Sequence, residues 1–337
     1  MNIAGQEISS KYPPFIIAEA SANHLGNLEK AFKLIIAAKW AGASAIKFQA
    51  YETDTITIDH DGPGFVLEDG PWKGKKLYDL YREAQTPFAW FPKLFEQAEK
   101  AGITAFASVF DKSSVDLLEG LECPAYKIAS FEITDLPLIE YAAKTGKPLI
   151  ISTGMASNEE IEDAYETGRN PVLLHCISGY PALPEETNLE NLVWLRDRYG
   201  PIVGLSDHTL GIEIPIAATA LGACIIEKHL TLARSDDGPD ANFSLEPNEF
   251  KAMVEATRMV WAALQPSNAP SENPQRQARR SLYVVQDIKT GEVLTSENVR
   301  SIRPAYGLPP KMLPEVLGKK AKIDLSRGTP LSIEIVE

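Results

Sequence analysis

Apolar and β-branched runs alternate with amphipathic stretches over the first 264 residues of this chain. Short apolar runs between turn residues are typical of buried parallel strands, whereas apolar positions that repeat at the helical period indicate helices. The runs predict strands at 15–21, 45–50, 103–110, 125–130, 148–154, 172–178, 203–209 and 225–231. The amphipathic stretches predict helices at 28–41, 92–101, 135–145, 157–167, 189–199, 212–221 and 249–264.

This alternation predicts an α/β protein with a parallel sheet. Eight βα units close naturally into a TIM barrel, so residues 1–264 are expected to form a (β/α)8 catalytic domain. Six or seven units would favour an open doubly wound sheet, which is the alternative fold. One segment, 51–91, is too long for an ordinary βα loop. Because it follows the second strand, we expect it to cover the carboxyl-terminal mouth of the barrel, where substrates bind.

The last part of the chain has a different composition. Residues 265–277 are rich in Pro, Ser and Asn, which indicates a linker. Short β runs at 281–285, 287–291, 299–304 and 322–330 predict a small β-rich domain over 278–337. This domain holds ten Lys and Arg against seven Asp and Glu, a net charge of +3, whereas the residues before it sum to −16. A domain of this size has a marginal core, so we expect it to dock against a barrel.

The whole chain has 337 residues and a formal net charge of −13, which disfavours binding to nucleic acid or to anionic membranes. No apolar run approaches the roughly 18 to 20 residues that a membrane span needs, and the N-terminus lacks the apolar core of a signal peptide. Cys123, Cys176 and Cys224 form neither a disulfide framework nor a zinc motif, and we interpret them as buried apolar residues. We therefore expect a soluble cytoplasmic protein.

Polar side chains stand at the end of every predicted strand, although the strands are otherwise apolar. The carboxyl ends of barrel strands meet at one mouth, so we expect these side chains to converge there. Because side chains alternate along a strand, Lys47 and Gln49 share a face, as do Ser206 and His208. The polar residues at the strand ends are Glu19, Lys47, Gln49, Ser108, Lys127, Ser130, Ser152, His175, Ser178, Ser206, Asp207, His208, Glu227, Lys228 and His229.

The two lysines within apolar strands, Lys47 and Lys127, indicate an anion site, because burying an unpaired ammonium is costly. Together with the nearby serines they predict a pocket for a phosphate and a carboxylate. The alternative is that each lysine forms an ion pair with Glu19, Glu132 or Glu227. If Lys47 instead formed a Schiff base with a substrate, the protein would be an aldolase that needs no metal.

His208 and His229 end adjacent predicted strands, and two imidazoles with open positions suit a divalent ion that acts as a Lewis acid. The alternative is a pair of histidines satisfied by hydrogen bonds. Asp240 could be a further ligand, an acceptor for a sugar hydroxyl or a turn residue. Trp72 and Trp90 could pack the long segment or stack on a sugar. The sequence contains no Walker loop, dinucleotide fingerprint or nucleophile elbow.

The residues along nearly the whole chain resemble the sialic acid synthase family of phosphoenolpyruvate-condensing enzymes. The motifs are Phe-Ile-Ile-Ala-Glu (15–19), Asn-His-x-Gly (23–26), Ile-Lys-Phe-Gln (46–49), Tyr-Lys-Ile-Ala-Ser-Phe-Glu (126–132), Ser-Thr-Gly-Met-Ala (152–156), Leu-Ser-Asp-His-Thr (205–209), Ile-Glu-Lys-His (226–229) and Gly-Pro-Asp (238–240). The tail resembles the antifreeze-like (SAF) domain of that family, through Ala-Arg-Arg-Ser-Leu (278–282), Ile-Arg-Pro (302–304) and Leu-Gly-Lys-Lys-Ala (317–321).

Within the family, the insertion at 70–81 and the segments 86–90 and 243–250 resemble the pseudaminate branch. Gly-Pro-Asp is closer to the neuraminate and legionaminate branches, so the sugar stays open between these three. The third strand carries Ala-Ser-Val-Phe (107–110) where the family usually has Ser-Thr-Pro-Phe, so Ser108 stands in for a phosphate-contacting threonine.

The resemblance implies a transferase that joins phosphoenolpyruvate to an open-chain sugar and releases phosphate. Phosphoenolpyruvate would be held by Lys47, Ser108, Lys127, Ser130, Ser152 and Ser206. A divalent ion, Mn²⁺ before Mg²⁺ or Co²⁺, would be bound by His208 and His229. The catalytic set would be Glu19, Lys47, Gln49 and Glu132, and sugar contacts would come from Tyr180, Asp240 and Arg303.

The resemblance also implies a domain-swapped homodimer, in which Arg303 reaches the N-acetyl group of a sugar bound by the neighbouring subunit. A non-catalytic sugar-binding protein is the more distant alternative. The set of Lys47, Lys127, His208 and His229 argues against it, because binding alone needs no such set.

Overall fold

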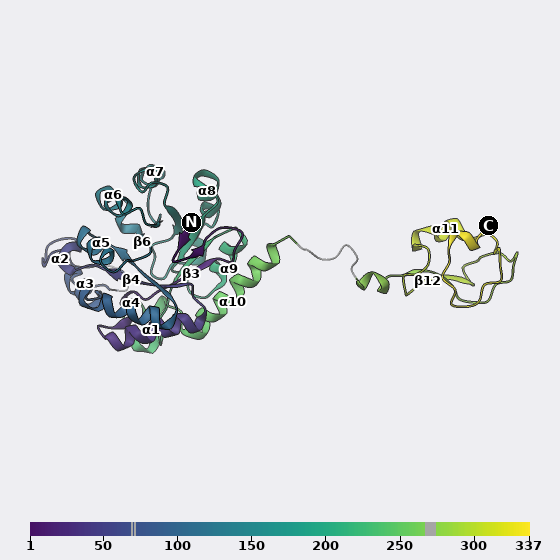
Figure 1. The fold of residues 1–337 in the computed structure, drawn as a ribbon, viewed down its shortest axis with the longest axis horizontal. Coiled ribbons are helices and arrows are strands. Elements are labelled where there is room, and N and C mark those ends of the chain that lie inside the picture. The colour runs from purple at the N-terminus through teal and green to yellow at the C-terminus, as the bar shows by residue number, and fades with distance from the viewer. Residues whose placement is uncertain (69, 71, 267–273) are drawn as a thin grey trace. The chain divides into compact units, whose positions relative to one another are not determined.

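Eight parallel strands close into a barrel in the computed structural model of the chain (Figure 1). The structure describes residues 1–68, 70, 72–266 and 274–337. The barrel strands are β3 (Phe15–Glu19), β4 (Ala45–Ala50), β5 (Thr104–Val109), β6 (Tyr126–Ile128), β7 (Leu149–Ser152), β8 (Val172–Cys176), β9 (Val203–Asp207) and β10 (Ile225–His229). Each strand pairs with the next along the chain, and β10 pairs with β3 to close the ring. The predicted TIM barrel is therefore confirmed, and the open sheet is excluded.

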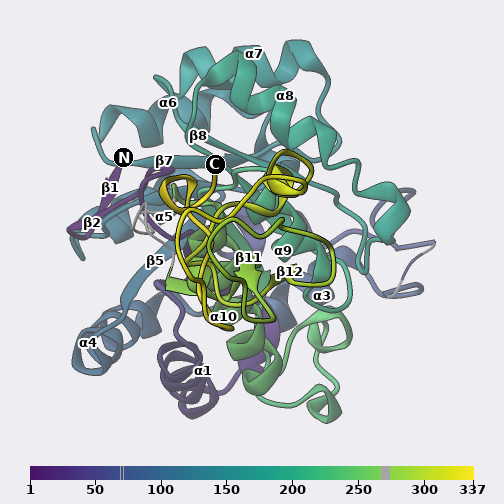
Figure 2. The ribbon, with the colours of Figure 1, turned by 90° about the vertical axis from the view of Figure 1, so that its right-hand side faces the viewer.

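Helices follow the strands and lie around the outside of the barrel (Figure 2). They are α1 (Leu28–Ala41), α4 (Phe91–Ala101), α5 (Lys112–Glu119), α6 (Leu136–Lys144), α7 (Asn158–Thr167), α8 (Glu190–Tyr199), α9 (Glu213–Ala220) and α10 (Pro247–Leu264). All seven predicted helices are present, and α5 was missed because its apolar positions are few. Its start is nevertheless marked in the sequence, since Asp111 and Ser114 form a capping box.

The strands are buried on both faces, which explains why the sequence shows continuous apolar runs there. Close packing also fixes a glycine within the barrel wall. A Cβ at Gly204 would lie 2.5 Å from the carbonyl oxygen of Ile225, so β9 admits no side chain at this position. The amino end carries a short hairpin, β1 (Asn2–Ile3) and β2 (Gln6–Glu7), which the sequence pattern missed. Ile3 and Ile8 bury their side chains in the barrel core.

The long segment after β4 contains two helices, α2 (Thr53–Ile56) and α3 (Leu77–Ala84). Side chains join the two ends of this segment to each other, and a further contact ties it to the turn after β3. The Tyr51 hydroxyl donates to the carbonyl oxygen of Tyr81 over 3.0 Å, and the Thr53 hydroxyl donates to Gln85 Oε1 over 2.7 Å. His24 Nε2 lies 3.1 Å from the hydroxyl of Thr86, and both residues are fully buried.

The chain divides into two compact units, Met1–Gln265 and Pro266–Glu337. The second unit contains an antiparallel pair, β11 (Ser281–Val284) and β12 (Val299–Ile302), and a short helix, α11 (Leu313–Val316). Its own core is built from apolar side chains that include Leu282, Val284, Leu294 and Leu331.

Two expectations for the second unit were wrong, because 287–291 and 322–330 are not strands. Each makes isolated bridges, such as Ile288 with Leu325 and Tyr283 with Pro330. Turn residues interrupt both segments, among them Gly291 and Gly328 at positive φ, so a continuous ladder cannot form. The proposed linker bounds, 265–277, stay a prediction, since 267–273 lie outside the described residues. None of the described helices combines the length and apolar character that crossing a membrane requires.

Candidate active site

The register of the barrel places the polar strand ends at common levels. Glu19 on β3 is the register partner of both Lys47 on β4 and His229 on β10. Ser108 on β5 is opposite both Gln49 and Lys127. These side chains thus come from neighbouring strands at matching heights in the carboxyl-terminal mouth. The expectation was wrong for Asp207 and Lys228, which pair with each other and which the alternation of side chains turns to the outer face of the barrel.

Lys47 lies at the centre of a buried charged cluster. Its ammonium is 2.5 Å from Glu19 Oε2, 3.4 Å from Glu227 Oε1 and 2.8 Å from the Ser108 hydroxyl. Burial opposes the charge on Lys47, but the two carboxylates outweigh it and raise the pKa of this lysine. For Glu19, burial raises the pKa of the carboxyl group, and the ammonium of Lys47 offsets this effect only in part. The ion-pair alternative therefore describes Lys47 in the absence of substrate.

Lys127 differs from Lys47 because its ammonium meets neutral acceptors. It donates to the Ser152 hydroxyl over 2.7 Å and to the carbonyl oxygen of Ile128 over 2.8 Å. Within the described part of the chain, no carboxylate lies within ion-pair distance of it, and the residue is 1% exposed. Burial lowers the pKa of Lys127. The carboxylate of Glu227 offsets the effect of burial only in part, and an ammonium without an ion-pair partner favours the anion-site interpretation for this lysine.

Hydroxyl groups gather around Gly154, directly after β7. The Gly154 N–H donates to Ser130 Oγ over 3.1 Å, and Ser178 Oγ is buried without a partner. A Cβ at Gly154 would lie 2.4 Å from Ser178 Oγ and 2.9 Å from Ser130 Oγ, so a side chain at this position would displace these hydroxyls. Ser178 was noted at a strand end but not assigned a role, and its unpaired hydroxyl now adds it to the candidate site.

The imidazoles of His208 and His229 lie side by side, with ring centroids 5.4 Å apart. His208 Nδ1 is 2.8 Å from the carbonyl oxygen of Ile177, which assigns the proton to Nδ1 and leaves Nε2 as an acceptor. His229 Nδ1 is buried and has no partner. Burial lowers the pKa of His229 well below its ordinary value, so this ring is neutral, the form that binds metals.

These two residues fit a divalent ion. The orphaned Nδ1 of His229 and the free Nε2 of His208 are ring nitrogens of the kind that ligate transition metals. Among the described residues, no three His, Cys, Asp or Glu side chains form a metal-binding group. His175, by contrast, contacts the carbonyl oxygen of Thr187 over 2.5 Å.

Glu132 ends the 3-10 turn Ser130–Glu132 after β6. Its Oε2 atom is buried without a partner. Burial raises the pKa of Glu132 to about 7, and the charge of Lys127 only partly offsets this effect. A carboxyl group that titrates near neutral pH, with one free oxygen, suits general acid–base catalysis.

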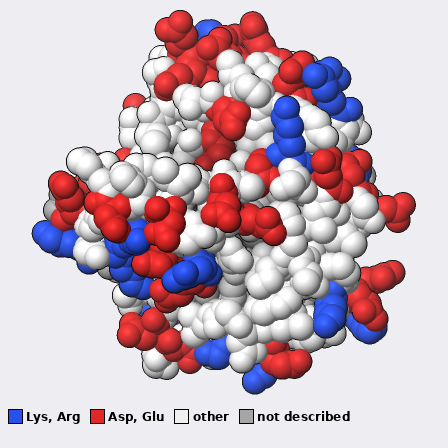
Figure 3. Space-filling view, turned by 90° about the vertical axis from the view of Figure 1, so that its left-hand side faces the viewer, with Lys and Arg blue, Asp and Glu red and all other residues white. Residues whose placement is uncertain are grey.

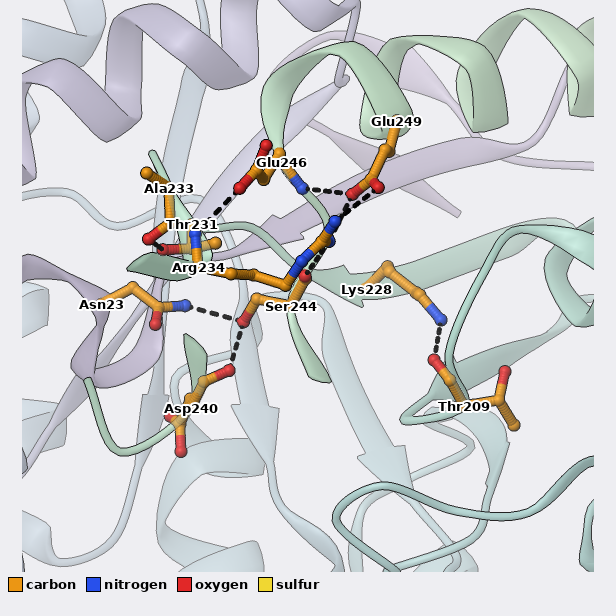
Figure 4. A network of polar contacts seen from close by, with 10 residues as sticks. All are labelled: Asn23, Thr209, Lys228, Thr231, Ala233, Arg234, Asp240, Ser244, Glu246 and Glu249. Carbon is orange, nitrogen blue, oxygen red and sulfur yellow. Dashed lines mark hydrogen bonds and ion pairs between the residues drawn. The ribbon is translucent and has the colours of Figure 1, made fainter. Parts of the chain in front are cut away.

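Asp240 is held in the loop between β10 and α10 by a chain of polar contacts (Figure 4). Asn23 donates to Ser244 Oγ over 2.9 Å, and Ser244 donates to the backbone oxygen of Asp240 over 2.6 Å. The buried carboxylate of Asp240 meets Ser21, which also accepts a hydrogen bond from Gln49 over 3.0 Å. Gln49 and Asp240 are thus joined through one serine.

The same loop is anchored to the start of α10. Arg234 forms a two-pronged contact with Glu249, with distances of 2.5 and 2.7 Å (Figure 4). The N–H of Arg234 also donates to Glu246 Oε1 over 2.9 Å. Bidentate pairing restricts both position and angle, so this anchor fixes the loop that carries Asp240.

Tyr180, after β8, packs between the histidine pair and the long segment. Its ring centroid is 4.3 Å from that of His208 and 6.0 Å from that of Trp72. Trp72 Nε1 donates to the backbone oxygen of Pro239 over 3.2 Å. The long segment therefore reaches the mouth as expected. Its Trp72 contacts Pro239, the residue before Asp240.

Changing Trp72 to Phe should keep the ring against Tyr180 but remove the hydrogen bond to Pro239. We expect the KM for a ligand bound beside Tyr180 and Asp240 to rise about 2- to 10-fold, the range of one net hydrogen bond, with no change in the KM for an anionic ligand of Lys47 and Lys127. Steady-state kinetics with each substrate varied in turn would measure this. Trp90→Phe, at a tryptophan that packs on His24, is the matched control. An equal change in both KM values would contradict the assignment.

Arg303 lies in the second unit, directly after β12, and its side chain is exposed.

The outer surface of the barrel unit seen in Figure 3 carries more acidic than basic side chains. Positive charge for an anionic substrate must then come from within the mouth, where Lys47 and Lys127 lie.

Comparisons with known proteins agree with this arrangement. The model of the NeuB family matches residues 34–268, and that of the SAF domain matches residues 279–336. The pseudaminic acid synthase of Campylobacter jejuni subsp. jejuni serotype O:2 is 46% identical over 325 residues, which cover 94% of this chain and 95% of that protein. The N,N'-diacetyllegionaminic acid synthase of Legionella pneumophila subsp. pneumophila is 36% identical over 336 residues, 96% of this chain and 94% of that protein.

A solved structure shows the same fold. The N-acetylneuraminic acid (sialic acid) synthetase from Leptospira borgpetersenii serovar Hardjo-bovis, in complex with citrate, superposes with a TM-score of 0.73. Its sequence is 35% identical, and the superposition covers 82% of this chain and 93% of that chain.

Proposed function

The chain belongs to the NeuB family, as its motifs predicted, and on this premise we propose that it is a pseudaminic acid synthase. It condenses phosphoenolpyruvate with 2,4-diacetamido-2,4,6-trideoxy-β-L-altropyranose and water to give phosphate and a nine-carbon 2-keto-3-deoxy acid. The observation that carries the reaction type is the buried ammonium of Lys127, which lies beside hydroxyl groups and has no ion-pair partner among the described residues. The sugar rests on the higher identity to the pseudaminic acid synthase than to the legionaminic acid synthase.

The anionic substrate is bound by the lysines and the hydroxyls. Lys127 and Ser152 supply one charged and one neutral contact, and the Gly154 N–H adds a backbone donor between Ser130 and Ser178. Lys47 and Ser108, on the neighbouring strands β4 and β5, supply the second charged contact. Ser206, which donates to Glu227 over 3.2 Å, completes the pocket. Two anionic groups on one small molecule match two ammonium groups.

His208 and His229 would hold a divalent ion, Mn²⁺ in our proposal, which polarises the carbonyl group of the open-chain sugar and stabilises the developing alkoxide. The protein holds the His229 ring in the neutral form and keeps the two rings at a fixed separation. Tyr180, Asp240 and Gln49 face the sugar. Trp72 and Tyr180 present ring surfaces suited to the apolar face of a deoxy sugar.

The bond changes then follow from the placement of charge. C3 of phosphoenolpyruvate donates its π electrons to the aldehyde carbon, and C2 becomes positively charged. The carboxylates of Glu19 and Glu227 stabilise this charge. Glu132 removes a proton from the water that adds to C2. Glu132 passes this proton to the alkoxide formed at the former aldehyde carbon. The bond between C2 and the bridging oxygen then breaks, phosphate leaves with the electron pair and takes up the proton of the C2 hydroxyl, and this hydroxyl becomes the keto group. Glu132 is the base in this scheme because Glu19 is already bonded to Lys47 and to the Ser21 N–H.

Activity should therefore depend on the ionisation of Glu132. Because burial raises the pKa of this carboxyl to about 7, the base form is lost as the pH falls through 7. We expect kcat/KM for phosphoenolpyruvate to be about tenfold lower at pH 6 than on the alkaline plateau. Glu132→Gln should remove this limb and lower kcat by about 10²- to 10⁴-fold.

The matched control for Glu132 is Glu140→Gln, an exposed carboxylate paired with Lys144 on α6. This variant should keep the wild-type pH profile. An acidic limb that survives in Glu132→Gln would assign the base to another group.

We also place the active enzyme in a homodimer, in the cytoplasm, where phosphoenolpyruvate is made. In this arrangement Arg303 from the second unit of one subunit binds the N-acetyl group of the sugar in its partner's barrel. The support is the exposure of Arg303 in the basic second unit and the family membership.

Phosphate release with separate sugars tests the proposed function. Three substrates are offered with phosphoenolpyruvate and Mn²⁺: the altro sugar, its legionaminate-type 6-deoxy-mannose counterpart, and N-acetylmannosamine. We expect release with the altro sugar alone, abolished by EDTA. Release with another sugar would keep the reaction and reassign the substrate. An absence of release with all three would contradict the synthase function.

A further inference from the structure

A buried ion pair lies behind the two histidines, on the face of the strands that points away from the mouth. Lys228 is fully buried and pairs with Asp207, which is 3% exposed. Side chains alternate along strands, so Lys228 faces opposite to Glu227 and His229, and Asp207 faces opposite to Ser206 and His208. The neighbours on this outer face, Leu205 and Ile226, are apolar and buried.

The ion pair holds the residues that flank His208. The Asp207 Oδ1 atom accepts the N–H of Thr209 over 3.1 Å and its hydroxyl over 2.8 Å. Lys228 donates to the carbonyl oxygen of Thr209, as Figure 4 shows. The carboxylate of Asp207 thereby fixes Thr209, the residue after His208. Lys228, which contacts both Asp207 and Thr209, directly precedes His229.

These contacts lie where the backbone pairing of the two strands stops. The β9–β10 register runs from the pair of Gly204 with Ile225 to that of Asp207 with Lys228. His208 and His229 lie one residue beyond it. The side-chain contacts of Lys228 with Asp207 and Thr209 thus continue the link between the strands at the level where the imidazoles begin.

Stability alone does not account for a charged pair at this place. A buried ion pair is on average no more stabilising than well-packed apolar side chains of similar volume, and the adjacent positions show that apolar side chains pack here. A charged pair with fixed hydrogen bonds does, however, define one geometry, as groups behind metal ligands do.

We propose that Asp207, Lys228 and Thr209 are positioning residues that set the separation and orientation of His208 and His229, and with them the affinity for a divalent ion. This inference rests on the metal assignment in the proposed function. None of the three touches the ion or the substrates; they act through the two histidines.

The test uses a neutral replacement of the pair in the full-length chain, Asp207→Asn with Lys228→Met. Asparagine keeps an acceptor for Thr209, and methionine keeps most of the lysine volume. Mn²⁺ binding to the metal-free protein is measured by the electron paramagnetic resonance of free Mn²⁺, and thermal unfolding is measured without metal. We expect an unchanged or higher melting temperature and a Kd for Mn²⁺ that is about 10- to 100-fold weaker.

A matched control removes a Lys–Glu pair at the amino end of the barrel. Glu119 and Lys147, 2.7 Å apart, are changed to Gln and Met, and Mn²⁺ affinity should stay at the wild-type value. Thr209→Val provides a second test, because it removes one hydrogen bond to Asp207 and leaves the ion pair. We expect a weaker Kd, by about 2- to 10-fold, at an unchanged melting temperature.

The outcomes separate the two claims. If the wild-type chain binds no Mn²⁺, the metal assignment of the proposed function is wrong. If the wild type binds Mn²⁺ and both the double variant and Thr209→Val bind it equally well, the positioning inference is wrong and the proposed function stands. A double variant that unfolds, together with wild-type affinity in Thr209→Val, would also overturn the inference, since the pair would then serve stability.

Discussion

Replacing Lys127 with Met should stabilise the substrate-free protein and abolish its activity. The ammonium of Lys127 is buried against Ser152 and a backbone carbonyl, with no carboxylate among the described residues near enough to pair with it. Removing a buried charge that has no ion-pair partner is expected to raise the free energy of unfolding by about 1–3 kcal/mol. Losing this contact to the substrate should lower kcat/KM by about 10³-fold or more.

Urea denaturation without ligands and phosphate release with both substrates would measure these two effects for Lys127→Met. Lys144→Met, at an exposed lysine on α6, is the matched control and should change neither quantity. If Lys127→Met instead lowers the free energy of unfolding, its loss of activity would follow from a damaged fold. This lysine would then serve the fold, and the anion-site interpretation would fail.

Replacing Lys47 with Met should abolish activity to a similar extent but with the opposite effect on stability. Glu19 and Glu227 would lose their shared cation, and two carboxylates would stay buried without an ion-pair partner. Breaking a buried pair in this way costs about 3–5 kcal/mol of the free energy of unfolding.

The loss in Lys47→Met should also depend on pH. Protonation neutralises the stranded carboxylates, so the deficit relative to wild type should shrink as the pH is lowered. Adding Glu227→Gln to Lys47→Met should recover part of the stability but none of the activity. Denaturation at two pH values measures both effects. A deficit that does not change with pH would show that the carboxylates are not the cause.

The contrast between these lysines could not be predicted from the sequence. Both stand in apolar strands, and the alternation of side chains predicts that both reach the mouth. Whether each meets a carboxylate depends on distances of a few ångströms across the barrel, and these follow from the register of β3, β4 and β10. Glu227 shares a face with His229, so the pattern placed it in the mouth without showing that it neutralises Lys47.

The barrel itself was predictable because its strands are buried on both faces and leave continuous apolar runs. The second unit was less so. Its strands are short and interrupted by glycines, so apolar runs such as 322–330 looked like strands although they form single bridges. The pair of Asp207 and Lys228 was also not predicted. Charged residues at the ends of strands are expected in the mouth, and only the alternation of side chains shows that these two lie on the outer face of the barrel.

The central claim, condensation with cleavage of the C–O bond in the mouth of the barrel, is tested most directly by isotopic labelling. Phosphoenolpyruvate carrying ¹⁸O at the bridging position is incubated with the altro sugar, Mn²⁺ and the enzyme. Phosphate is analysed by ³¹P NMR and the acid by mass spectrometry. We predict that the label leaves in the phosphate, together with an unlabelled nine-carbon acid and only when the sugar is present. Labelled pyruvate with unlabelled phosphate, formed without the sugar, would contradict the account.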